Sequence, residues 1–187
     1  MGAVYLSPYD RDSKELLELF HIAKRRNIPI KTVSRGDLVE QSKFNNLTLL
    51  YPPSLQSEMD ELQGSADSKM NNRCIVLELT SFGKRFLFMA DTEKGAEMII
   101  AREYKHRVNV LELGHHGSKT STSEEFLDTI KPELSVISLG RYNHFHFPAP
   151  VVIERLKSRN IPVFRTDQTG CIEFRIRENF FLEQDCE

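Results

Sequence analysis

The feature that most constrains the fold is a regular alternation of short apolar runs and helical patterns between residues 74 and 159. Two apolar runs, 74–80 and 85–90, flank the segment Ser81-Phe-Gly-Lys84, which is typical of a β-hairpin turn. The run 85–90 is apolar on both faces, so we expect it in the centre of a layered core. Helices and strands then alternate, and this order predicts a layered α/β fold.

The same patterns predict elements over most of the chain. We expect helices at 13–26, 93–104, 124–130 and 151–159, strands at 3–7, 29–33, 47–51, 108–113 and 134–139, and a final hairpin at 163–176 that turns at Thr169-Gly170. Ser13 is the expected N-cap of the first helix. Residues 56–72 are polar, with a glycine and several serines, and predict a loop.

Composition limits the class of protein. The 187 residues suit one domain with a sizeable core, and no apolar run approaches the roughly 20 residues that cross a bilayer. The start of the chain does not have the pattern of a signal peptide, so a soluble chain is expected. The net charge is −2, from 25 basic and 27 acidic residues, so electrostatics alone do not predict binding to nucleic acid.

Three cysteines are too few and too scattered for a disulfide framework or a cysteine zinc site. Their number is a weak indication of a reducing compartment. Cys74 opens an apolar run and is expected to be a buried thiol.

Candidate metal ligands follow two of the expected strands. Asp91 comes directly after the run 85–90, and His115 and His116 follow the strand 108–113 between two glycines. Side chains at the carboxyl ends of neighbouring strands gather at one edge of a layered α/β sheet. A carboxylate oxygen and an imidazole nitrogen placed there could share one metal ion. The competing interpretation makes Asp91 a helix N-cap and leaves both histidines in an exposed turn.

Hydroxyl side chains follow the histidine pair, in Ser118-Lys-Thr-Ser-Thr-Ser-Glu-Glu125. Ser121 with Glu124, or Thr122 with Glu125, has the spacing of a capping box. We favour capping over direct catalysis, and a loop that holds phosphate oxygens is the alternative.

Aromatic and imidazole side chains alternate further along the chain. His144 and His146 alternate with Phe145 and Phe147 before Pro148. This pattern predicts either an exposed aromatic loop or a surface for base stacking. Elsewhere, Asp167 is expected in the turn of the final hairpin and His21 at the surface of the first helix.

The stretch from Leu111 to Phe126 closely resembles a signature of the metallo-β-lactamase-like domain of ComEC, a family of bacterial membrane channels that import DNA during transformation. Segments 71–77, 86–91, 131–140 and 163–167 resemble other segments of that family in order and spacing. The resemblance runs from about residue 71 to 176, and more loosely back to Val4.

This resemblance implies an αββα sandwich in which metal ions at the strand ends polarise a water that attacks a phosphodiester or similar bond. The bridging aspartate of the family corresponds to Asp91 and its later histidine to His115, with His116 as the alternative. His116, Ser118, Thr120 and Ser121 are expected to line the site, and no residue is assigned a catalytic role. Zinc or manganese is the expected cofactor of the complete domain, and this chain alone is also compatible with binding no metal.

Three departures from the family pattern affect these expectations. The main ligand cluster of the family, His-x-His-x-Asp-His, is absent, and in the family it precedes the segment that residues 4–7 resemble. Ala90 stands where the family has glycine, and Phe147 where it commonly has histidine. We therefore expect one N-terminally truncated domain over 1–187, with 1–70 as the remainder of its first half and 71–178 as the second half with the motifs.

The leading hypothesis is a metal-dependent, nuclease-type hydrolase domain of a DNA-uptake competence protein, inactive alone because two ligands are too few. Its implied partners are DNA and the transmembrane channel domain of the same parent chain, with this domain outside the cytoplasm. The alternatives are a fragment of a freestanding soluble hydrolase of the same fold and a non-catalytic half-domain. Missing strands would leave an exposed apolar edge, which predicts self-association.

Overall fold

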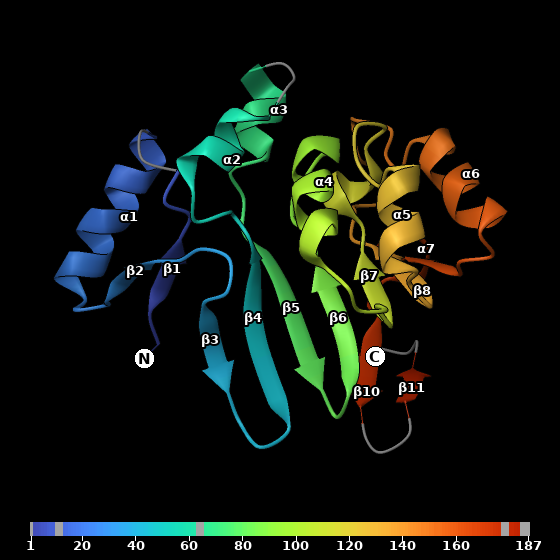
Figure 1. Cartoon of the computed structure of the whole chain (residues 1–187), viewed down its shortest axis with the longest axis horizontal. Coiled ribbons are helices and arrows are strands. Elements are labelled where there is room, and N and C mark those ends of the chain that lie inside the picture. Colours follow the sequence, from blue (N-terminus) through green and yellow to red (C-terminus); the bar gives the residue numbers. More distant parts are fainter. Residues whose placement is uncertain (1, 10–12, 63–65, 177–179, 184–187) are drawn as a thin grey trace.

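The computed structural model describes residues 2–9, 13–62, 66–176 and 180–183, and its centre is a seven-stranded mixed sheet (Figure 1). In spatial order the strands are β3 (Leu38–Gln41), β4 (Asn45–Tyr51), β5 (Val76–Ser81), β6 (Lys84–Phe88), β7 (Val110–Glu112), β8 (Leu134–Ile137) and β9 (Val163–Arg165). Neighbours from β3 to β6 are antiparallel, and those from β6 to β9 are parallel. The predicted α/β class is confirmed.

Two smaller sheets flank this centre. β1 (Val4–Leu6) pairs in parallel with β2 (Ile30–Thr32), and α1 (Lys14–Arg25) connects them. Ser13 caps α1 as predicted, because its side chain accepts a hydrogen bond from the amide of Leu16 at 3.1 Å. β10 (Glu173–Ile176) pairs antiparallel with β11 (Phe180–Glu183).

Helices cover one face of the main sheet. The helices over this face are α4 (Lys94–Glu103), α5 (Glu124–Ile130) and α6 (Pro150–Ser158) (Figure 1). Of the shorter helices, α2 (Gln56–Asp60) adds Met59 to the core, whereas no described side chain of α3 (Ala66–Asn71) or α7 (Thr166–Thr169) belongs to it. Alternate residues of the central strands, such as Leu87, Leu111 and Ile137, enter one buried cluster with residues of α4, α5 and α6. This cluster is the main core. Ala96, Ile99, Ile100 and Tyr104 turn inward in it, as predicted.

The other face of the main sheet has a smaller apolar cluster. Phe86, Val110 and Leu134 pack there against Phe174 and Ile176 of β10. The small β10–β11 sheet therefore lies against the main sheet, but coverage is partial, since Phe88 on this face is 39% exposed. A large sheet with helices is thus established, while a complete αββα sandwich stays an expectation.

Some expectations about local structure are wrong. Residues 56–72 contain α2 and α3 instead of a loop, and β3 was not predicted. Residues 163–176 do not form a hairpin, because β9 joins the main sheet and β10 pairs with β11. Asp167 accordingly lies in α7, where it accepts hydrogen bonds from Arg165.

The cysteines differ in state. Cys74 is free, with its sulfur 4.0 Å from the carbonyl oxygen of Met89, and burial raises its thiol pKa to about 12. Cys171 is disulfide-bonded, which the cysteine number alone did not indicate. Within the described part of the chain, no helix is both long and apolar enough to cross a membrane.

Candidate functional site

The candidate site lies where β6 and β7 end side by side. Because these strands are parallel, their carboxyl ends meet, and the amide of His115 donates a 2.7 Å hydrogen bond to the carbonyl of Ala90. His115 and His116 both have left-handed backbone conformations, with φ of 47° and 54°. Such conformations are costly for non-glycine residues and tend to occur at functional sites. The turn thus brings the histidine pair beside Asp91.

Asp91 faces His116. The Oδ1 atom of Asp91 lies 3.7 Å from Nε2 of His116, and each side chain is 51% exposed. The other ring nitrogen of His116 donates a 2.6 Å hydrogen bond to the carbonyl of Ser138, which directly follows β8. A backbone partner of this kind fixes the tautomer and leaves the second nitrogen free to bind a metal.

His115 faces a different carboxylate. Its Nδ1 atom lies 3.3 Å from Oε1 of Glu93, a buried residue. Ser68 and Asn71 donate hydrogen bonds to Glu93 at 2.5 and 2.9 Å. Burial acts to raise the pKa of Glu93, but hydrogen bonds from Ser68, Asn71 and Thr120 and the charge of His115 bring it below its usual value. Glu93 therefore lies beside the His115 ring as a carboxylate, but Nδ1 of His115 is buried and has no hydrogen-bond partner among the described residues.

The Asp91–His116 pair is compatible with a shared divalent cation. Two ligand atoms at about 2.0–2.2 Å from one ion can lie up to roughly 4 Å apart, and the observed separation of 3.7 Å is within that limit. Two protein ligands are fewer than the three that catalytic zinc sites use. Among the residues that the structure describes, no group of three or more His, Cys, Asp or Glu side chains could hold a metal ion.

Glu112 is a further carboxylate close to the Asp91–His116 pair, and it was not predicted. Burial raises the pKa of Glu112, the last residue of β7, and the charge of Asp91 adds to that effect while His116 opposes it. Glu112 pairs with Phe88 across the sheet, on the face away from the main core. Strand alternation in Leu111-Glu112-Leu113 was the available signal for that orientation.

The capping interpretations are not supported. The N-cap of α4 is Glu93 rather than Asp91, and no side-chain cap bond forms at the start of α5. Instead, the buried carboxylate of Glu97 accepts hydrogen bonds from the amides of Thr122 and Ser123. A side chain of α4 therefore caps the N-terminus of α5.

The hydroxyl-rich segment 118–123 holds the preceding turn at Gly114–Gly117, which we call the histidine turn, in place. The buried hydroxyl of Ser121 lies 2.7 Å from the carbonyl oxygen of Gly114 and 2.9 Å from that of Ser118, and can donate to either. Ser118 and Thr120 contact each other through their hydroxyls at 3.0 Å. Thr120 and Ser121, but not Ser118, line a hollow of about 690 Å³ that also includes Glu93. This hollow contains none of Asp91, His115 and His116, so the lining of the candidate metal site by these hydroxyl residues stays a prediction.

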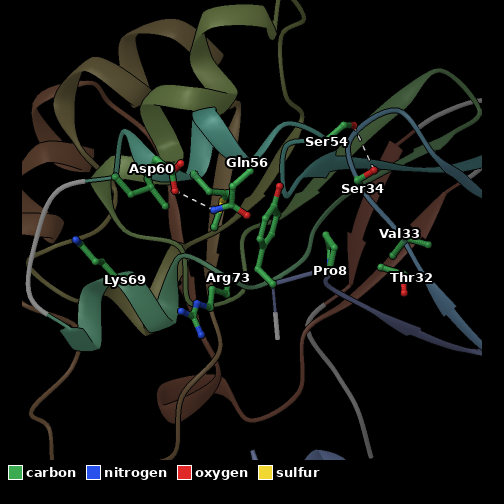
Figure 2. Close-up of a pocket in the computed structure, with 12 residues that line it drawn as sticks. Pro8, Thr32, Val33, Ser34, Ser54, Gln56, Asp60, Lys69 and Arg73 are labelled. Atoms are coloured by element: carbon green, nitrogen blue, oxygen red, sulfur yellow. Dashed lines mark hydrogen bonds between the residues drawn. The ribbon is translucent and has the colours of Figure 1, made fainter. Parts of the chain in front are cut away.

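A second hollow, of about 700 Å³, is lined by residues 8–9 and 32–34 together with residues of α2, α3 and their flanking segments. None of the candidate ligands lines it. Figure 2 shows its polar side chains, including the hydrogen bonds from Ser54 to Ser34 (3.2 Å) and from Gln56 to Asp60 (2.9 Å). It is therefore distinct from the Asp91–His116 pair.

The loop that carries His144 and His146 borders the site through Phe147. The Phe147 ring meets His115 edge to face, with centroids 5.6 Å apart. An aromatic ring thus contacts the histidine turn at the position where the family commonly has histidine. His144 and His146 are exposed in this loop, and His21 is exposed on α1.

Ala90→Gly is expected to raise the free energy of unfolding by about 0.5–1 kcal/mol. Ala90 has a φ of 49°, where an L residue is strained and glycine is not, and this gain exceeds the entropy that glycine adds to the unfolded chain. Urea unfolding measures the change. Ala101→Gly, the same exchange inside α4, should instead lose about 1 kcal/mol. Destabilisation by Ala90→Gly would contradict the strained geometry.

The chain resembles competence proteins from several bacteria, although no protein-family profile matches it. ComE operon protein 3 of Bacillus subtilis is 31% identical over 161 residues, which cover 86% of this chain and 19% of that protein. Recombination protein 2 of Haemophilus influenzae is 38% identical over 115 residues, and Competence protein ComA of Neisseria gonorrhoeae is 34% identical over 106 residues. These matches cover 61% and 56% of this chain, and 14% and 15% of the relatives.

These similarities place the chain in the class of competence proteins. The chain belongs to the ComEC-like family of competence proteins. It spans less than one fifth of the length of these relatives.

Proposed function

We propose that the chain is part of a metal-dependent, nuclease-type hydrolase domain that acts on incoming DNA in a DNA-uptake competence protein. The observation that supports this most is the Asp91–His116 pair, two ligand types 3.7 Å apart at the ends of adjacent parallel strands. The second ring nitrogen of His116 is held by the backbone of Ser138, as is typical of metal-ligating histidines.

In this proposal Asp91 supplies a carboxylate oxygen and His116 supplies Nε2, while Ser138 orients the ring. His115, the ligand that the family resemblance implied, is assigned a supporting position because it faces Glu93. A zinc or manganese ion bound there would polarise a water for attack on a phosphodiester. Ser121 positions the histidine turn through Gly114.

The remaining ligands are proposed to come from a His-x-His-x-Asp-His segment, which this sequence does not contain. The purified chain is therefore expected to show little or no metal-dependent cleavage of single- or double-stranded DNA with manganese or zinc. Incubation with each metal, with a chelator control, measures this. Robust chelator-sensitive cleavage would show that the chain holds a complete site.

Two further observations agree with the family architecture. The packing of β10 on the second face of the main sheet is compatible with the start of a second layer in an αββα sandwich. The disulfide at Cys171 favours a compartment outside the cytoplasm over a reducing one, in line with a membrane-embedded parent channel. Self-association through the partly exposed second face of the main sheet stays a prediction, which light scattering can test.

A role in DNA uptake can be tested in a chimera. The segment of Neisseria gonorrhoeae Competence protein ComA that aligns with this chain is replaced by this chain's sequence, and transformants are counted. Asp91→Asn in the chimera should lower transformation by about 100-fold or more, as expected for loss of a metal ligand. Asp128→Asn, which alters an exposed carboxylate on α5, is the control. Equal transformation with and without Asp91 would favour the non-catalytic half-domain.

A further inference from the structure

The loop between β8 and α6 presents two aromatic side chains to solvent. Tyr142 is 88% exposed and Phe145 is 78% exposed, the highest values for large hydrophobic side chains among the described residues. We call residues 140–149 the aromatic loop. Isolated exposed hydrophobic residues need no explanation, but two in one loop beside a candidate site suggest a binding surface.

Internal hydrogen bonds hold the aromatic loop in shape. Asn143 accepts a hydrogen bond from the amide of Phe147 at 2.7 Å and donates one to the Phe147 carbonyl at 3.0 Å. The amide of Ala149 donates to the carbonyl of Gly117 at 2.9 Å, which joins the loop to the histidine turn. The exposed rings are therefore held by a fixed backbone, and little ordering entropy would be lost on binding.

The rings form a continuous path from solvent to the histidine turn. Phe145 stacks on Phe147 with centroids 5.6 Å apart and an interplanar angle of 18°. Phe147 in turn contacts the ring of His115. A flat group stacked on the open face of Phe145 would thus lie two ring contacts from His115, the sequence neighbour of the proposed ligand His116.

The charge of the loop suits a polyanion. Residues 138–149 include Arg141, His144 and His146 and no aspartate or glutamate. Aromatic stacking next to positive charge is how single-stranded nucleic acids are bound without sequence preference. A duplex keeps its bases stacked inside and cannot offer them to such rings.

We propose that the aromatic loop is a stacking platform for the unpaired bases of single-stranded DNA, through Tyr142 and Phe145. This inference rests on the proposed function, because it names the form of DNA presented to that site. It does not require bound metal, since stacking and charge provide the contacts.

The chain contains a matched control surface. Phe44 and Phe82 stack with centroids 4.7 Å apart and an interplanar angle of 9°, and they are 50% and 45% exposed. They lie in the β3–β4 and β5–β6 turns, at the opposite end of the sheet from the end of β6 (Figure 1). Removal of this pair deletes equivalent exposed rings far from the site.

Fluorescence anisotropy with a labelled oligothymidylate of 12 nucleotides, in low salt with a chelator, tests the proposal. Wild type should bind this probe more tightly than a 12-base-pair duplex. Tyr142→Ala/Phe145→Ala should bind it about tenfold or more weakly, and Phe44→Ala/Phe82→Ala should match wild type. Tyr142→Leu/Phe145→Leu, which keeps apolar area without rings, should also lose affinity.

Three outcomes would overturn the proposal. They are no preference of wild type for the single strand, unchanged binding by the Tyr142→Ala/Phe145→Ala variant, and an equal loss in the Phe44→Ala/Phe82→Ala variant. Because the assay contains a chelator, none of these outcomes bears on the metal site, which a metal titration tests separately.

Discussion

Glu97→Ala is expected to lower the free energy of unfolding by about 3–5 kcal/mol, which would leave the chain only marginally folded. Glu97 is fully buried in α4 and accepts hydrogen bonds from the amides of Thr122 and Ser123. Its removal leaves two buried N–H groups without an acceptor and opens a cavity. Urea unfolding followed by circular dichroism measures the loss.

The pH dependence gives an independent check of the Glu97 carboxyl. Burial raises its pKa, although hydrogen bonds from Ser123 and Thr122 and the charge of Arg155 oppose that shift. A raised folded-state pKa means that the stabilising contribution is complete below the unfolded pKa and declines as pH rises through the folded value. Glu97→Gln, which keeps the volume, should remove this decline.

Glu125→Ala provides the control for both measurements. Glu125 lies on α5 in an exposed ion pair with Lys94, and such pairs contribute little to stability. A loss from Glu97→Ala no larger than that from Glu125→Ala would show that Glu97 does not hold the start of α5.

Gly114→Ala is expected to cost about 2–3 kcal/mol through overpacking. A Cβ atom at Gly114 would lie 2.7 Å from the carbonyl oxygen of Thr92 and 3.1 Å from its hydroxyl, so the backbone would have to shift. That shift would separate the histidine turn from the end of β6. Thermal unfolding measures the effect.

Gly140→Ala is the matched control, because no heavy atom lies within 4 Å of a Cβ atom placed there. It should change stability by less than about 0.5 kcal/mol. Equal effects of the two substitutions would contradict the close approach of the histidine turn to Thr92.

The sequence predicted best where local patterns and tertiary packing agree. The helix expected at 124–130 is α5, with the same bounds, because its apolar residues face the core. Residues 56–72 lack apolar periodicity, yet α2 forms there and Met59 and Leu62 are buried against the main core. The segment 163–176 was misread because the parallel pairing of β9 with β8 is not local.

The sequence predicted that the two candidate segments converge, but not which side chains pair, and the metal site itself stays a prediction. Asp91 and the histidine pair were expected at one edge of the sheet, and the hydrogen bond from His115 to Ala90 joins those segments. Which histidine faces Asp91 depends on two consecutive left-handed residues, and sequence periodicity does not report backbone handedness. Glu93 and Glu97 were missed because their partners lie 22 to 26 residues away in the chain.

The most direct test of the account is a titration of manganese(II) into the isotope-labelled chain, followed by NMR. Paramagnetic broadening reports the position of a bound ion even when two ligands bind it weakly. We predict that the amide signals of Ala90, Asp91 and His116 broaden first, and that Asp91→Asn or His116→Ala abolishes this pattern. Broadening centred elsewhere, or unchanged in both variants, would contradict a metal site at the ends of β6 and β7.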